Sequence, residues 1–130
     1  MSTDAPESEW VREGVLVEGL QDAVALGEVH NLFAHYGAES QRPTSQVQQL
    51  TLHLIRELVE QGLAVLGTPD RRGNFNAWDL PLDDAMAKIE DAYITHFADR
   101  RGWTHMGWLN LTDQGEQVAL ELYHAGETET

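Results

Sequence analysis

Four carboxylates stand close together in the second half of the chain, at Asp83, Asp84, Glu90 and Asp91. The apolar residues around them recur at helical spacing, which predicts one helix with all four carboxylates on its solvent-facing side. Acidic residues are too abundant in this sequence for these pairs to indicate acid–base catalysis. They indicate instead a surface that attracts a basic partner, to which the nearby Trp78 would add an aromatic anchor.

A second group of side chains is typical of contacts with nucleic acid. Glutamine can hydrogen-bond adenine through two atoms, serine and threonine contact phosphates, and arginine supplies positive charge. The candidates are Thr44, Ser45, Gln46, Gln49, Arg56, Arg71 and Arg72. We place Gln48 and His53 on the same exposed helix face as the other glutamines. That face carries one arginine and no lysine, so an amide-rich surface facing solvent is the alternative interpretation.

The sequence lacks cysteine and the motifs that commonly mark catalytic or cofactor sites. The chain has no cysteine, which excludes disulfides, thiolate nucleophiles and cysteine-ligated metals. Its six histidines include no His-Glu-x-x-His pair or other metal-ligand spacing. The sequence also lacks a glycine-rich dinucleotide loop, a phosphate-binding loop and a serine nucleophile elbow. We therefore expect no enzyme activity, no bound metal and no cofactor.

The charge balance is strongly acidic, with 22 Asp and Glu residues against 8 Lys and Arg and a formal net charge of -14. Such a chain is repelled by phosphates and is steered toward basic partners. The alternative interpretation is that the acidity serves solubility alone. No apolar run approaches the ~20 residues that span a bilayer, and the acidic start lacks the features of a signal peptide. We expect a cytoplasmic location and no membrane contact.

The length of 130 residues suits one domain, which we place over 9–124, between acidic tails, 1–8 and 125–130, that we expect to be disordered. Apolar periodicity, glycines and prolines divide this domain into helices and strands. The predicted helices are 9–23, 28–36, 44–62, 81–100 and 113–123, and the predicted strands are 23–26, 63–66 and 103–111. The helix over 81–100 forms most of an insertion at about 68–102. Trp103 and Trp108 would point to opposite faces of the last strand.

Three stretches carry a resemblance to a known fold. They are Leu26-Gly27-Glu28-Val29-His30 entering the second helix, Leu58-Val59-Glu60-Gln61-Gly62-Leu63-Ala64-Val65 ending the third, and Leu111-Thr112-Asp113-Gln114-Gly115-Glu116 entering the last. Over roughly 9–67 and 103–123 the chain resembles the winged helix-turn-helix of bacterial regulators such as the MarR and PadR families. The resemblance implies a mainly α (α+β) domain with a small antiparallel sheet, in which the third helix would read DNA. The inserted helix departs from both families.

Two functions follow from these observations. The first is a non-enzymatic acidic protein-binding domain, similar in size and charge to immunity or antitoxin proteins that neutralise a basic partner. The alternative is a winged-helix transcription regulator, acting as a homodimer because one such module rarely supplies enough affinity. Its dimer face would lie on the first and last helices, through Trp10, Val11 and Tyr123. A structural role in a larger assembly is a third interpretation. The charge favours a basic protein over nucleic acid as the partner.

Overall fold

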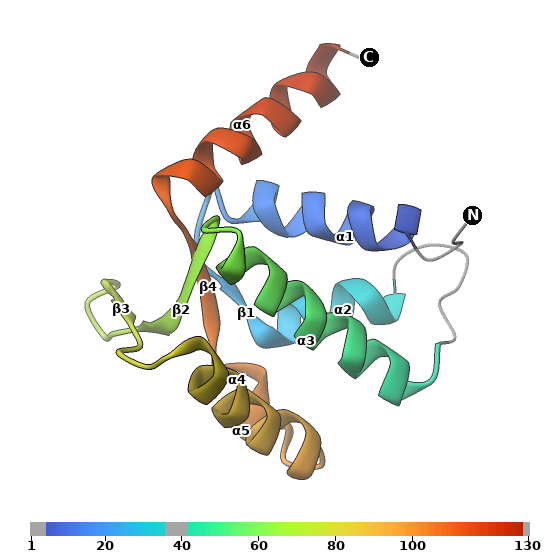
Figure 1. Ribbon diagram of the computed structural model, residues 1–130, viewed down its shortest axis with the longest axis vertical. Helices are drawn as coiled ribbons and strands as arrows, with labels where there is room; N and C mark the ends of the chain where they lie inside the picture. Colours follow the sequence, from blue (N-terminus) through green and yellow to red (C-terminus); the bar gives the residue numbers. More distant parts are fainter. Residues whose placement is uncertain (1–4, 36–41, 129–130) are drawn as a thin grey trace.

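The structure is a computed structural model that describes residues 5–35 and 42–128. In this part of the chain, six α-helices and one π-helical turn pack with a four-stranded antiparallel sheet, so the predicted mainly α class is confirmed (Figure 1). In chain order the elements are α1 (Ala5–Glu18), β1 (Val24–Ala25), α2 (Leu26–His35), α3 (Thr44–Glu60), β2 (Ala64–Pro69), β3 (Phe75–Ala77), α4 (Leu82–Glu90), the π-helical turn η1 (Asp91–Thr95), α5 (Arg100–Thr104), β4 (Trp108–Leu111) and α6 (Asp113–Thr128).

The sheet has the strand order β1-β4-β2-β3, and all neighbouring strands are antiparallel. Figure 1 shows α1, α2 and α3 grouped on one side of the sheet, α6 beyond one end, and α4 and α5 beyond the other. The strand predicted over 63–66 continues to Pro69, because its second half pairs with β3 from Gly67 opposite Ala77 to Pro69 opposite Phe75. The sheet therefore ends in a hairpin.

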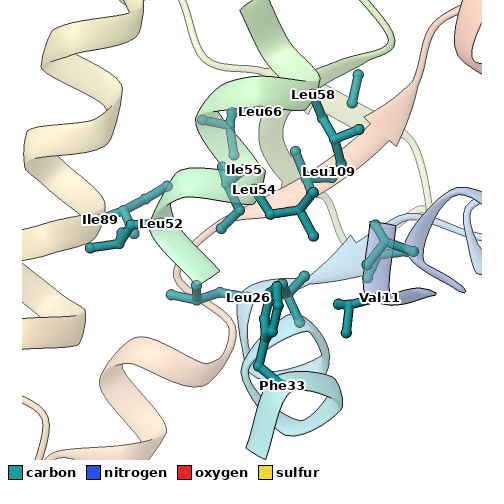
Figure 2. Close-up of a cluster of buried hydrophobic side chains, with 14 of the residues drawn as sticks. Val11, Leu26, Phe33, Leu52, Leu54, Ile55, Leu58, Leu66, Ile89 and Leu109 are labelled. Carbon is teal, nitrogen blue, oxygen red and sulfur yellow. The ribbon is translucent and has the colours of Figure 1, made fainter. Parts of the chain in front are cut away.

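The core lies between α3, α2 and the sheet. Leu58, Ile55 and Leu54 from the predicted apolar stripe of α3 are at most 4% exposed, and Leu109 of β4 is 2% exposed. Figure 2 shows these side chains converging from the helix and from the strand. Burying each such side chain contributes about 1.5–3 kcal/mol relative to leaving it in water. The helical periodicity of α3 thus predicts the centre of the domain correctly.

The inserted segment is not the single helix predicted over 81–100. The α-helix α4 ends at Glu90 and continues as the π-helical turn η1, and a new helix, α5, begins at Arg100. The side chain of Asp99 accepts a hydrogen bond from the backbone N–H of Gly102 at 3.2 Å, which caps this restart. Trp103 therefore lies in α5 and not on a strand, and the last strand contains only Trp108–Leu111.

A buried aromatic cluster joins the inserted segment to α2. His30 contacts Tyr93, Phe97 and Trp103, with ring centroids 5.1–5.7 Å away. Phe97 and Trp103 stack at 5.1 Å, and the Trp103 indole N–H donates to the Phe97 carbonyl at 2.8 Å. In this packing Trp103 belongs to a helical turn and is buried. The apolar alternation over 103–111 therefore predicts a strand that begins too early.

The bounds of the first and last helices also differ from the prediction. Helix α1 begins at Ala5 instead of residue 9, since Pro6 suits the first turn of a helix, and it ends at Glu18 before Gly19. Helix α6 continues to Thr128 instead of ending at Tyr123. Of the predicted disordered tails, 1–4 and 129–130 lie outside the described residues, as does the predicted end of the second helix at residue 36. None of the helices within 5–35 and 42–128 is long and apolar enough to cross a bilayer.

Candidate functional site

The four carboxylates at 83, 84, 90 and 91 lie along one outer side of the inserted segment. Asp83 and Asp84 stand in the first turn of α4, Glu90 ends that helix, and Asp91 begins η1. Asp83 and Glu90 are about two helical turns apart, as are Asp84 and Asp91, so each pair projects in a similar direction. All four side chains are exposed. We call this surface the α4 acidic face.

The α4 acidic face is in direct contact with α3. Asp83 Oδ1 accepts a hydrogen bond from Arg56 Nη1 at 2.9 Å, and the same nitrogen lies 3.6 Å from Glu60 Oε1. The hydrogen bond to Asp83 is the largest of the effects that raise the pKa of Arg56 above its ordinary value. Arg56 is the single Lys or Arg in α3. The cation expected to meet a phosphate is therefore held between two carboxylates.

Most, but not all, of the α3 residues that the sequence places on an exposed face are exposed in the structure. Thr44, Ser45, Gln46 and Gln49 are exposed on the first two turns of the helix. Gln48 is not on this surface: its side chain is 9% exposed, and Nε2 donates to the Tyr93 carbonyl at 3.3 Å. Placing Gln48 on the exposed face was wrong because the inserted segment covers that side of α3, which the helical pattern alone does not reveal.

The tip of the β2–β3 hairpin carries Arg71 and Arg72. The Asp70 carboxylate accepts hydrogen bonds from the backbone N–H groups of Arg72 at 2.8 Å and Asn74 at 2.9 Å. These two hydrogen bonds lower the pKa of Asp70, and the bond from Asn74 has the largest effect. Gly73 completes the turn with φ +85, a conformation that suits glycine. Both arginines are exposed, and neither makes an ion pair within the part of the chain that the structure describes.

A small apolar groove lies beside the α4 acidic face. It has a volume of about 180 Å³ and is lined by side chains that include Val59, Val65, Trp78, Leu80, Leu82 and Ala85. Trp78 is half-buried, and Lys88 Nζ lies 4.4 Å from the centroid of its ring. We call this feature the Leu80 groove. Of its residues, only Trp78 was a sequence candidate. The signal that marks the groove is a large apolar residue, Leu80, set between Asp79 and Pro81.

Of the three residues predicted for a dimer face on α1 and α6, two are at the surface and one is not. Trp10 and Tyr123 are 55% and 49% exposed. Val11 is 2% exposed, because it packs into the core and is not on the outer side of α1. A dimer contact that uses the exposed side of these helices cannot include Val11.

The described residues contain no group of three or more His, Asp or Glu side chains arranged to hold a metal ion. Comparisons with protein-family models, with curated proteins and with solved structures found no match. The surface features of the described residues that bear on function are the α4 acidic face, the Leu80 groove and the hairpin tip.

Proposed function

We propose that this chain is a non-enzymatic acidic domain that binds a basic protein, in the manner of an immunity or antitoxin protein. The observation that carries the proposal is the α4 acidic face, where four exposed carboxylates line one side of a helical segment. Two cations stand beside this face: Arg56 is bound to Asp83 and Glu60, and Lys88 of α4 lies over the ring of Trp78. They neutralise only part of its charge. Asp84, Glu90 and Asp91 remain exposed to a partner.

Electrostatics favour this function over binding to a polyanion. A formal net charge of -14 raises the rate of encounter with a basic protein and lowers it with DNA. Carboxylates fixed on a helix gain more from such an encounter than carboxylates on a loose tail, because less side-chain and backbone freedom is lost on binding.

The finer fold that we propose is a winged-helix-like domain with a helical insertion. The order of α1, β1, α2, α3, β2, β4 and α6 supports this proposal. The segment containing α4, η1 and α5 separates the hairpin from β4 and lies against α3. Because the inserted segment partly covers α3, the helix that would read DNA, this fold is better suited to a partner other than DNA.

The test of the protein-binding function compares two variants of equal charge change. One reverses Asp84, Glu90 and Asp91 to lysine; the other reverses Asp113, Glu116 and Glu121, three exposed carboxylates of α6. The immobilised wild-type chain is used to isolate a partner from cells that make it, and the affinity of that partner is then measured by calorimetry. We expect the α4 variant to weaken binding at least tenfold and the α6 variant to weaken it much less. Equal affinities for wild type and the α4 variant would contradict the proposal.

A second function, DNA binding by a winged-helix regulator, is favoured by one observation. Arg71 and Arg72 stand at a hairpin tip that Asp70 holds in place, so two exposed cations are presented together. The test is binding to a labelled random-sequence duplex at low salt, followed by a salt titration. Micromolar binding that weakens as salt rises supports this function, and the absence of binding at low salt excludes it.

A further inference from the structure

The Leu80 groove is hollow and apolar, whereas the α4 acidic face beside it is a row of exposed carboxylates. We propose that it receives one apolar side chain of a partner segment in which lysine or arginine flanks that apolar residue. This inference rests on the proposed function, since it concerns how the same basic partner is held. The α4 acidic face would attract the segment, and the groove would anchor it.

The size of the groove limits what it can take. Pockets for drug-sized ligands and cofactors have volumes of ~300–1,000 Å³. The Leu80 groove, at about 180 Å³, is too small for them. A cavity of ~150 Å³ lined by apolar side chains holds a benzene ring. One leucine, methionine or phenylalanine side chain is therefore the natural occupant.

The lining of the groove is apolar and partly open to water. Leu80 is 44% exposed and Val65 is 37% exposed, although both side chains are apolar. They come from different parts of the fold: Val65 from β2, and Leu80 from the segment that joins β3 to α4. The backbone bond from Trp78 N–H to the Leu66 carbonyl, at 2.9 Å, holds that segment against β2. The groove is thus preformed and does not require the partner to create it.

The charges around the groove select a basic segment. Asp79 adjoins Leu80 in the chain and Asp84 adjoins Ala85, and both carboxylates are exposed. Glu60, which adjoins Val59, is already paired with Arg56. Lys88 of α4 already lies over the ring of Trp78, with Nζ 4.4 Å from the ring centroid, so we assign the cations of the partner segment to the carboxylates and not to this ring. A second copy of the chain, which carries the same net charge of -14, is a poorer match than a lysine-rich segment.

Continuity between the two features supports a single partner. Asp84 lies in the first turn of α4 beside Ala85, which lines the groove, and it also belongs to the α4 acidic face. A segment whose apolar residue enters the groove would therefore place its flanking cations over carboxylates. Side chains that contribute most to the binding energy of protein interfaces commonly fill such pockets and are surrounded by contacts that exclude water.

The test uses three labelled synthetic peptides: leucine between two pairs of lysines, alanine in the same setting, and leucine between two pairs of glutamates. Binding is measured by fluorescence anisotropy, and contacts are mapped from backbone amide shifts in NMR spectra. The variants are Leu80→Arg and Leu80→Ala, with Leu120→Arg as the matched control, because Leu120 on α6 is 42% exposed. Exposed positions are chosen so that the variants fold, which thermal unfolding verifies.

We expect wild type and Leu120→Arg to bind the lysine–leucine peptide at least tenfold more tightly than the lysine–alanine peptide, with shifts at Val65, Leu80 and Ala85. Leu80→Arg should lose this preference. Equal binding of both lysine peptides, with shifts confined to Asp84, Glu90 and Asp91, would overturn the groove proposal and leave the proposed function standing. Tighter binding of the glutamate peptide would overturn both. Self-association of the chain that Leu80→Arg abolishes would make a second copy the occupant and overturn the proposal.

Discussion

The Nδ1 atom of His30 lies 2.5 Å from the hydroxyl oxygen of Tyr93, and this hydrogen bond joins α2 to the π-helical turn η1. His30 is 8% exposed and Tyr93 is completely buried. Burial lowers the pKa of His30, and electrostatic interactions, that with Arg100 above all, lower it further. Burial also raises the pKa of Tyr93 to about 12. Both side chains are therefore neutral at pH 7. The hydrogen bond that holds the inserted segment to α2 thus joins two uncharged groups.

The lowered pKa of His30 predicts a loss of stability in acid. In the unfolded chain this histidine takes up a proton near its ordinary pKa of 6.5, whereas the folded chain resists protonation until a lower pH. The unfolded state therefore binds more protons between these two values, and the free energy of unfolding falls as the pH drops below about 6.5. Urea unfolding followed by fluorescence from pH 7.5 to pH 5.5 measures this dependence.

The control for this prediction replaces one histidine at a time with glutamine, which does not titrate. His30→Gln should show a smaller loss of stability over that pH range than wild type, and His53→Gln, at an exposed position of α3, should resemble wild type. The raised pKa of Glu28, caused first by its desolvation, acts in the opposite direction but is common to all three proteins. Identical pH slopes for wild type and His30→Gln would contradict the assignment.

Removing the hydroxyl of Tyr93 should destabilise the domain without changing its shape. Tyr93→Phe keeps the ring in the aromatic cluster but leaves His30 Nδ1 without its partner. Leaving a buried polar group unpaired costs about 1–3 kcal/mol. Tyr123→Phe, at a position that is 49% exposed, should change the free energy of unfolding by less than about 0.5 kcal/mol. Equal stabilities of the two variants, measured by urea unfolding at pH 7.5, would show that the hydrogen bond contributes little.

Replacing either of two helical glycines with alanine should change the free energy of unfolding, in opposite directions at the two positions. A Cβ atom at Gly115 would lie 1.9 Å from the Leu63 carbonyl oxygen, so α6 and the start of β2 would have to separate. We expect Gly115→Ala to lower the free energy of unfolding by about 3 kcal/mol. A Cβ atom at Gly14 would meet nothing within 4 Å, and alanine there should stabilise α1 by about 0.5–1 kcal/mol. A stabilising Gly115→Ala, in the same urea experiment, would disprove the close approach.

If the chain binds DNA, the hairpin tip should account for most of its salt dependence. Each phosphate contact contributes about 0.9 to the slope of log affinity against log salt. Arg71→Ala with Arg72→Ala should therefore reduce that slope by about 2, whereas Arg100→Ala with Arg101→Ala makes the same charge change on α5 and should reduce it less. Equal reductions in a fluorescence-anisotropy titration would mean that net charge, and not the hairpin tip, governs binding.

The DNA-binding alternative makes one further prediction about α3. Gln46→Ala with Gln49→Ala should remove any preference between DNA sequences without changing the salt slope, because glutamine contacts bases and adds no charge. Asp83→Asn should strengthen non-specific binding, since it removes a carboxylate that holds Arg56. Competition between two duplexes of different sequence measures the first effect. Unchanged discrimination in the glutamine variant would exclude α3 as the reading helix.

The sequence by itself determines the elements whose signals are local. The apolar stripe of α3 and the Gly62 that follows it predict both the helix and the residues that fill the core, because side chains three and four positions apart share a helix face. The carboxylates of α4 are likewise predicted to lie outside, since an ionised group loses too much hydration when buried alone.

Only the tertiary structure decides which of these elements meet. The pattern over 81–100 does not reveal the break between α4 and α5, because that break is stabilised by packing of Trp103 and Phe97 against His30, far away in the chain. The burial of Gln48 and the pairing of Arg56 with Asp83 depend in the same way on where the inserted segment rests. Contacts between distant residues arise from the packing of whole elements, and the periodicity within one element does not predict which other element it packs against.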